Sequence, residues 1–472
     1  MPREIITIQC GQCGNQVGHK FWDMALREHA ASNPRAIFDH ALSSLFRNVN
    51  SRIPSLQIPV ADGKHPIRSL KARAVLIDME EGAVNQLLKG PLSELFDEKQ
   101  LFTSTAGSGN NWACGHDFYG PKYADVILEK VRREVELCQS LQSFFLLHSL
   151  GGGTGSGLGS YIFELLHDAY PKVFRVSAAV FPSADDDVIT SPYNSLFSTV
   201  ALAENADCVF TVDNLALIEI IRKSTKPIFH NGLGLNAHSG AKWRDMEKPF
   251  DGMNGIVSQL LLHLTSSVRF EGSLNVDLNQ IPTNLIPYPR LRFLVSSMGP
   301  LNRSSPSDMA KQSQAFNQIV SEVFSRDNQL IKCNPMGSTF LACALFARGE
   351  RCTISDLNDS LARVRKRVKM IHWNTEGFKM GICHQPALGL PISLLCVANN
   401  TCMRTRFLAM KGSFNKLYKR RVYVHHYAEY MNSDDFKTYS GELDDLIEEY
   451  ANLDIATAPA ENSQFKPPAT GF

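Results

Sequence analysis

The stretch Gly151-Gly152-Gly153-Thr154-Gly155-Ser156-Gly157 decides the fold of this chain. The apolar run Phe144–His148 comes before it, and a helical stripe of large apolar residues comes after it, formed by Tyr161, Ile162, Leu165, Leu166 and Tyr170. Five glycines in seven residues let a ligand approach the backbone closely, and the amide groups at the start of a helix favour an anion. The stretch therefore predicts a phosphate-binding loop between a strand and a helix.

Two earlier apolar runs also end at polar loops. Ile5–Gln9 leads into Cys10–Gln16, and Ala72–Ile77 ends at the carboxylates of Asp78, Glu80 and Glu81. Strand, loop and helix repeated in this order are typical of a parallel α/β sheet, whose ligands bind at the carboxyl ends of the strands. We therefore predict an α/β fold with its binding site at that edge of the sheet.

Periodicity and composition divide the chain into four parts. A first α/β region is predicted in the first half of the chain and a second one beyond about residue 256, the latter with a helical stripe at 316–324 and a strand-like run at 340–346. The periodicity fades at about 222–248, which predicts an insertion. Apolar residues at helical spacing between 436 and 450 predict C-terminal helices at 400–454, and the Ala-, Pro- and Ser-rich residues 455–472 predict a disordered tail.

Composition argues against several classes of protein. The chain has 48 Lys and Arg against 47 Asp and Glu, so no overall field attracts nucleic acid. No apolar run reaches the roughly 18 residues of a membrane helix, so we expect no membrane partner. The 11 cysteines show no regular spacing, which predicts reduced thiols in a cytoplasmic protein.

Two local features have both a functional and a structural interpretation. Cys10-x-x-Cys13 is half of a zinc site or a redox pair, but no second such pair and no histidine cluster completes it. The basic runs Arg363–Lys369 and Lys419–Arg421 resemble nucleic-acid patches. Because the net charge does not support that function, we interpret both runs as solvated helix faces or protein contacts.

Three kinds of phosphate loop compete for the glycine stretch. A Walker A loop needs Gly-Lys followed by Ser or Thr, and the Gly63-Lys64 pair is followed by His65. The stretch does not satisfy G-x-G-x-x-G, which weakens a dinucleotide-dependent metabolic enzyme, although that class stays open as an alternative. The third kind is the loop of tubulins and their bacterial relatives, with the signature GGGTGSG. The chain resembles the tubulin family over about residues 1–453.

Several further motifs of that family stand in the expected order. They are Gly11–Gln16, Asp78–Glu80, Gly107–Trp112, Val212–Asn214, Phe250 with Asn254, Gly272–Asp277, Trp373 with Gly377–Lys379 and Gln385-Pro386, and Val424–Tyr427. Within the family the chain most resembles the epsilon branch, through residues 76–82 and 186–192 and the insertion before Phe250. The delta and gamma branches are the nearest alternatives.

The resemblance implies a tubulin-like fold: a parallel-sheet GTP-binding domain at 1–214, an intermediate α/β domain at 215–399 and a C-terminal helical layer at 400–454. It implies GTP or GDP as the nucleotide, with Mg²⁺. The residues implied to contact the nucleotide are Gln12, Cys13, Gln16, Asn110, Ser149, Gly151, Gly152, Gly153, Thr154, Gly155, Asn214, Phe250 and Asn254. Glu80 is implied to hold Mg²⁺ directly or through water, with Asp78 as a second candidate, because carboxylate oxygens suit this hard cation.

The chemistry of the implied base contacts agrees with these roles. The amides of Asn214 and Asn254 carry both an acceptor and a donor, which matches the edge of guanine. Phe250 offers a ring on which the base stacks, where the family usually has Tyr. We therefore expect these three residues to select the base.

One departure concerns catalysis. Asp277 is kept on the loop implied to act on a neighbouring subunit's nucleotide, but Gln280 stands where the family has a catalytic acid. An amide orients water yet cannot accept its proton, so we expect at most a weak GTPase.

The resemblance also implies partners and a place in the cell. Other tubulin subunits are implied to bind by head-to-tail contact, and centriolar proteins are implied as further partners. The implied location is the cytoplasm and cytoskeleton, at the centrosome, centriole or basal body, with a role in doublet and triplet microtubules. After Asp454 the only acid is Glu461, so we expect no long acidic tail like those of α- and β-tubulin.

Overall fold

The computed structural model describes most of the chain. The described residues are 3–33, 35, 40–49, 57–58, 67, 69–183, 186–224, 249–270, 272–301, 312–350 and 352–456. Residues 225–248 of the predicted insertion and residues 457–472 of the predicted tail lie outside them. Arg222–Ser224, which we assigned to the insertion, end a helix instead, and Ile455, which we assigned to the tail, is the last residue of another.

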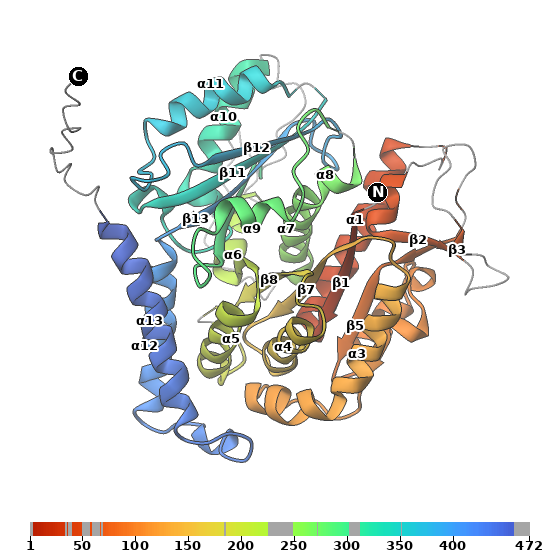
Figure 1. The fold of residues 1–472 in the computed structure, drawn as a ribbon, viewed down its shortest axis with the longest axis vertical. Helices are drawn as coiled ribbons and strands as arrows, with labels where there is room; N and C mark the ends of the chain where they lie inside the picture. Colours follow the sequence, from red (N-terminus) through yellow and green to blue (C-terminus); the bar gives the residue numbers. More distant parts are fainter. Residues whose placement is uncertain are drawn as a thin grey trace, which may run out of the picture.

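A mostly parallel sheet runs through the molecule (Figure 1), with ten strands in the described residues. In spatial order the strands are β12 (Phe378–Cys383), β11 (Phe340–Arg348), β13 (Ser393–Asn400), β10 (Phe293–Gly299), β9 (Cys208–Asp213), β8 (Phe174–Phe181), β7 (Leu141–Ser149), β1 (Glu4–Cys10), β5 (Ala74–Asp78) and β6 (Leu101–Thr103). Only β13 runs antiparallel, against both β10 and β11. The predicted α/β class is confirmed, and the parallel pairing of β9 with β10 carries the sheet from the first predicted domain into the second.

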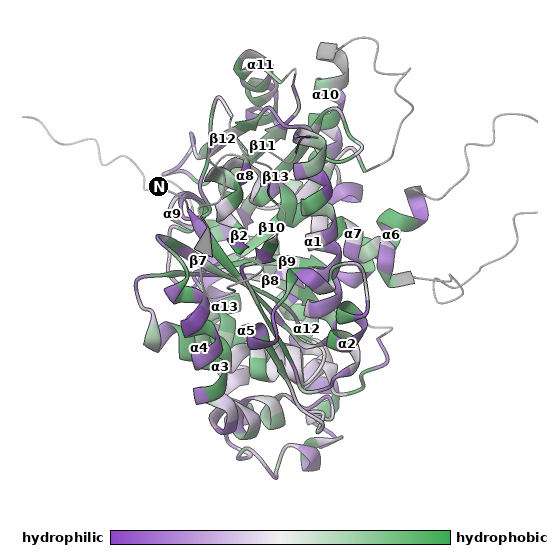
Figure 2. Cartoon of the chain, turned by 90° about the vertical axis from the view of Figure 1, so that its right-hand side faces the viewer, coloured by the Kyte–Doolittle hydropathy of each residue, from purple (hydrophilic) through white to green (hydrophobic). Residues whose placement is uncertain are grey.

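Helices cover both faces of the sheet. They are α1 (Gly11–Ser32), α2 (Gly82–Leu88), α3 (Gly120–Glu136), α4 (Gly159–Ala169), α5 (Ser191–Asn205), α6 (Asn214–Ser224), α7 (Pro249–Leu264), α8 (Ser266–Arg269), α9 (Gln280–Leu285), α10 (Gln312–Val323), α11 (Ile354–Arg365), α12 (Met403–Tyr418) and α13 (Asp435–Ile455). Figure 2 shows hydrophobic residues along the strands in the interior.

Alternate residues of each central strand enter different cores. In β7, Phe144 and Leu146 pack with α3, α4 and α5, whereas Phe145 and Leu147 pack with α1 and α7. Both faces of such a strand are buried, so its sequence is a continuous apolar run and does not alternate with polar residues. A third core joins α10 and α11 to β11 and β13.

The strand predicted over Ala72–Ile77 is confirmed from Ala74 onward, but Ala72 belongs to another strand, and the buried Arg73 lies between the two. β4 (Leu70–Ala72) belongs to a small antiparallel sheet with β2 (Phe46–Val49) and β3 (Gln57–Ile58), and β5 begins at Ala74. Between them, Arg73 is paired with Glu4 at 2.6 Å and donates from Nε to the Ser43 carbonyl at 2.9 Å. A buried charge needs such partners, and these contacts turn the chain from one sheet to the other.

The C-terminal helices α12 and α13 pack on α5, outside the sheet (Figure 1). Asp454, near the end of α13, accepts hydrogen bonds from the hydroxyls of Thr339 at 2.9 Å and Thr401 at 2.7 Å. This contact fixes the end of α13 to the second half of the sheet. In the part of the chain that the structure describes, no helix has the length and apolarity needed to span a membrane.

Candidate nucleotide-binding site

Two loops meet at the carboxyl ends of β1 and β7. Gly11, the first residue of α1, has φ +75°, and a Cβ on it would lie 3.0 Å from the Gly155 nitrogen. The Cys10 thiol lies 3.5 Å from the Thr154 carbonyl oxygen. The structure therefore places the start of α1 directly against the glycine loop, as the resemblance implied.

The third loop, Gly107–Trp112, packs on the other side of the glycine loop. Its turn uses left-handed backbone at Gly109 (φ 58°) and Asn110 (φ 54°). The hydroxyls of Ser108 and Thr154 lie 2.9 Å apart. A Cβ on Gly153 would lie 2.5 Å from Ser108 Oγ, so the protein's own packing requires glycine there.

Gly152 differs from its neighbours in having open space beside it. A Cβ on Gly152 would meet only Asn110 Oδ1, at 3.7 Å, which is an ordinary contact. Packing within the chain therefore does not explain glycine at this position. A ligand held against the loop would explain it, because its atoms would need the space that a side chain takes.

The helix starts at this site are suited to an anion. Neither α1 nor the π-helical turn Thr154–Leu158, which leads into α4, has a side-chain cap or an acidic residue in its first turn. The first amides of a helix have no partner within it, and the helix dipole adds positive potential there. The two starts together could hold phosphate oxygens through the backbone, with Ser149 Oγ supporting the loop by accepting from the Gly151 nitrogen at 3.2 Å.

Other predicted nucleotide contacts lie on the first turns of α1. The Gln12 side chain is exposed, and Cys13 and Gln16 are half-buried. Burial, with a smaller contribution from Asp186, raises the pKa of the Cys13 thiol to about 12. Cys13 is therefore a neutral thiol at physiological pH and not a thiolate ligand or nucleophile.

The two predicted metal ligands lie at the end of β5. Asp78 is buried, its Oδ2 lies 3.5 Å from Asn15 Nδ2, and burial raises its pKa to about 6. Glu80 is exposed beside Gly107, where an added Cβ would lie 2.6 Å from Glu80 Oε1. No group of three or more His, Cys, Asp or Glu that could hold a metal ion occurs among the described residues. The two carboxylates of Asp78 and Glu80 fit Mg²⁺, which commonly takes one or two carboxylates together with phosphate oxygens and water.

The predicted base contacts lie on two adjoining helices. Asn214 begins α6 directly after β9, where Asp213 Oδ1 accepts from the Leu215 nitrogen at 3.0 Å. Phe250 is 49% exposed and Asn254 is half-buried, both on α7. α7 packs on α1 in one hydrophobic core, and an exposed ion pair of 3.1 Å joins Lys20 to Asp251 across the contact. The three residues thus stand on elements that adjoin the site.

Two positioning residues were missed by the sequence reasoning. The first is His148, whose Nδ1 donates to the Gly155 carbonyl at 2.7 Å while Nε2 accepts from the Ser177 hydroxyl at 2.9 Å. Burial lowers its pKa to about 4, so the ring is neutral and holds the glycine loop as a hydrogen-bond donor. Its signal in the sequence was a histidine at the end of an apolar run.

The second is Asn194 on α5, which is fully buried and whose side chain makes five hydrogen bonds, the longest from Nδ2 to Thr190 Oγ1 at 3.5 Å. Its Nδ2 donates to the carbonyls of Asn110 and Gly151, both at 2.8 Å. Its Oδ1 accepts from the Trp112 nitrogen at 2.9 Å and from the Tyr427 hydroxyl at 2.6 Å. One amide therefore joins the third loop, the glycine loop and the C-terminal layer, and no local sequence pattern marked it.

Asp277 and Gln280 lie at the opposite end of the sheet. Asp277 is paired with Arg3, the residue before β1, whereas the glycine loop meets the far end of β1 at Cys10. At about 3.3 Å per residue, the seven residues of β1 separate these ends by roughly 20 Å. Asp277 therefore cannot act on a nucleotide bound at the site in its own chain. Gln280 begins α9, and its side-chain oxygen is buried without a hydrogen-bond partner in the described structure.

Comparison with known proteins identifies a family. Residues 4–222 match the Tubulin/FtsZ family GTPase domain, and residues 289–411 match the tubulin C-terminal domain. The chain is 48% identical to the human tubulin epsilon chain over 95% of this chain and 96% of the relative. It is 32% identical to the tubulin beta-2 chain of Suillus bovinus, over 99% of both chains. It is also 32% identical to the tubulin alpha-3 chain of Saccharomyces cerevisiae, over 96% of this chain and 98% of the relative.

Proposed function

Since the chain belongs to the tubulin family of cytoskeletal proteins and is more similar to the human epsilon chain than to the two alpha and beta chains named above, we propose that it binds GTP or GDP with Mg²⁺. The site is formed by the starts of α1 and α4, the glycine loop and the third loop. The observation that carries the proposal is the open space beside Gly152, between two uncapped helix starts. Glu80, with Asp78, is the proposed holder of Mg²⁺.

The nucleotide released from the purified protein tests this proposal. Denatured protein, analysed by ion-exchange chromatography, is expected to yield GTP or GDP in near-stoichiometric amount. Release of NAD(H) or FAD would favour the metabolic enzyme instead. Chelation of Mg²⁺ is expected to weaken retention of a triphosphate, because the metal neutralises phosphate charge.

Base selection is assigned to Asn214, Asn254 and the ring of Phe250. Adenine would leave amide groups of the site unpaired, and each buried unpaired group costs about 1–3 kcal/mol. GTP is therefore expected to displace a labelled guanine nucleotide far better than ATP does, and Asn214→Ala should narrow the difference. Equal competition by ATP in the parent protein would contradict the assignment.

The placement of Asp277 supports assembly by head-to-tail contact. Its loop and the nucleotide loops lie at opposite ends of the same strand, so a second subunit stacked in the same orientation would bring one against the other. Such head-to-tail contacts build open filaments when the rotation from one subunit to the next does not close into a ring. We propose other tubulin subunits as the partners, with weak hydrolysis across the contact because Gln280 replaces the acid.

The cellular role that we propose is assembly or maintenance of the doublet and triplet microtubules of centrioles and basal bodies. The higher identity to an epsilon chain than to alpha and beta chains supports this role over one in the bulk polymer. Imaging of the tagged protein in ciliated cells is expected to show it at centrioles or basal bodies. A uniform distribution along cytoplasmic microtubules would overturn the proposal.

A further inference from the structure

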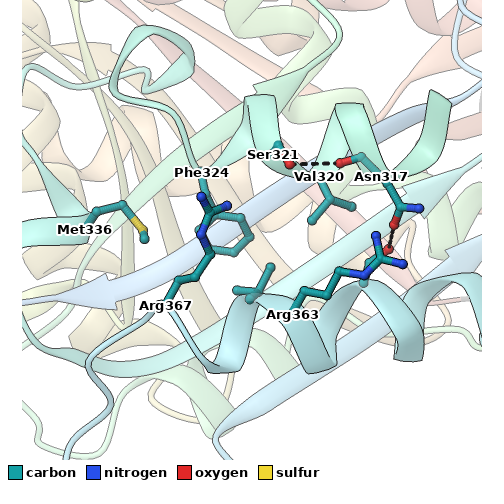
Figure 3. A pocket seen from close by; sticks show the side chains of 9 residues that line it. Asn317, Val320, Ser321, Phe324, Met336, Arg363 and Arg367 are labelled. Carbon is teal, nitrogen blue, oxygen red and sulfur yellow. Dashed lines mark hydrogen bonds between the residues drawn. The ribbon is translucent and has the colours of Figure 1, made fainter. Parts of the chain in front are cut away.

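A cleft lies between α10 and α11, on the second half of the sheet and outside the nucleotide site (Figure 3). Its volume is about 100 Å³, which is enough for one aliphatic side chain. The cleft is lined by Asn317, Val320, Ser321, Phe324, Met336, Ser360, Arg363, Val364 and Arg367. We call it the α10–α11 cleft.

The inner walls of the cleft are apolar, and the hydroxyls of Ser321 and Ser360 that line it both donate to Asn317. Val320 on α10 and Val364 on α11 line it. Phe324 and Met336 lie at one end (Figure 3). The buried Ser360 hydroxyl donates to Asn317 Oδ1 at 2.9 Å. The cleft therefore offers a surface for an apolar side chain and makes little demand for a polar one.

The rim of the cleft is positively charged. Arg363 and Arg367 lie on it, and Lys366 is exposed between them in the chain. The neighbouring Arg365 is paired with Glu376 at 2.6 Å, and Lys369 donates to the Asp454 carbonyl at 3.1 Å. In the part of the chain that the structure describes, no ion pair is recorded for Arg363, Lys366 or Arg367.

We propose that the α10–α11 cleft binds an acidic segment of a protein partner, with one aliphatic side chain between Val320 and Val364 and carboxylates against Arg363 and Arg367. Charge complementarity selects an acidic partner, and guanidinium groups bind carboxylates in a fixed, two-pronged geometry. Exposed ion pairs contribute little by themselves, so the apolar anchor supplies the affinity that charge alone lacks. The combination favours a peptide over a nucleic acid, which has no aliphatic side chain to insert.

Selection from a displayed library of random twelve-residue peptides tests the proposal, with the full chain as bait. The peptides retained by the parent protein are expected to be rich in Asp and Glu around one Leu, Ile or Val. Arg363→Glu combined with Arg367→Glu is expected to reduce their retention at least tenfold. Ser321→Leu, which adds an aliphatic group at the cleft and leaves both arginines, is expected to abolish the aliphatic preference.

The matched control carries the same charge change at another basic cluster. Lys419→Glu combined with Arg420→Glu, both exposed after α12, is expected to leave retention unchanged. Retention lost equally in this control would show a general effect of net charge and would overturn the proposal. Failure of the cleft variants to change which peptides are retained would overturn it too. So would concentration-dependent self-association that the cleft variants abolish, since the cleft would then bind a second copy. Nucleotide content, measured in parallel, is expected to stay unchanged.

Discussion

The Tyr427 hydroxyl donates a hydrogen bond to Asn194 Oδ1 at 2.6 Å, although the two residues are 233 positions apart in the chain. Asn194 in turn holds the carbonyl of Gly151 in the glycine loop. A second link runs in parallel, because Asn111 Nδ2 donates to the His426 carbonyl at 2.7 Å. The segment between α12 and α13 is thus connected by hydrogen bonds to the loops of the candidate nucleotide site.

Asn194→Asp is expected to weaken both the fold and the nucleotide site. The carboxylate has nearly the same shape but cannot donate to Asn110 and Gly151, and each buried group left unpaired costs about 1–3 kcal/mol. Thermal unfolding and binding of a fluorescent GTP analogue measure the two effects. Asn205→Asp is the matched control, because Asn205 lies on the same helix and, among the described residues, its side chain donates only to the Ala201 carbonyl, away from the nucleotide loops. An unchanged GTP affinity in Asn194→Asp would show that Asn194 does not position the loop.

Gly152→Ala is expected to separate ligand binding from folding. The metal- and nucleotide-free protein should keep its unfolding temperature, because the new methyl has room, while GTP affinity falls at least tenfold, or about 1.4 kcal/mol. Gly153→Ala should instead destabilise the free protein, since its Cβ would lie 2.7 Å from the Asn111 nitrogen. Gly412→Ala on α12, where a Cβ meets nothing within 4 Å, is the control. Normal GTP affinity in Gly152→Ala would place the phosphates elsewhere.

Gln280→Glu is expected to accelerate GTP hydrolysis only in assemblies. A general base contributes about 10²–10⁴-fold, and the nearby Asp277 lies roughly 20 Å from the site in its own chain. Phosphate release should therefore rise at least about tenfold in a head-to-tail assembly and stay constant in the monomer. Asn284→Asp introduces the same charge one turn further along α9 and should have no such effect. Equal rates in the parent and Gln280→Glu assemblies would remove Gln280 as the determinant.

The free energy of unfolding is expected to fall as the pH rises from about 6.5 to about 9, because His116 loses its proton in this range. Its Nδ1 lies 2.7 Å from Asp117 and its Nε2 2.9 Å from Glu164. Burial lowers the pKa of His116, but the hydrogen bonds and charges of both carboxylates outweigh it and raise the pKa from 6.5 to about 9. Because the folded-state pKa is the higher one, the stabilisation is complete below pH 6.5 and disappears as the pH passes 9.

His116→Gln tests this pH dependence. The variant should be less stable than the parent at pH 6 by about 1–2 kcal/mol, since the carboxylates are partly exposed, and the difference should vanish near pH 9.5. Unfolding temperatures measured across this range give the result. The exposed His167→Gln should show no comparable trend. A difference that is constant with pH would mean that His116 acts by packing on Trp112 and not by charge.

The sequence predicted the elements whose evidence is local. Phe144–Leu147 are apolar at every position because both faces of β7 are buried. The glycines of Gly151–Gly157 indicate that another group lies close to the backbone of this loop. The same reasoning did not predict that the chain passes from one sheet to another at Arg73, between β4 and β5. At that change of sheet, Arg73 pairs with Glu4, which is 69 residues away and lies outside any local window of sequence.

Only the tertiary structure decided how the candidate site is held and what lies opposite it. His148 and Asn194 hold the loops through hydrogen bonds to residues on other segments of the chain. The sequence around a single polar side chain does not show which residues it will contact in the fold. Asp277 follows α8 in the chain, yet its place beside Arg3 puts it at the far end of β1 from the glycine loop. The sequence determined which chemistry the chain carries, since residue types and spacings are local. The fold determined which groups meet, because packing brings together residues that are hundreds of positions apart.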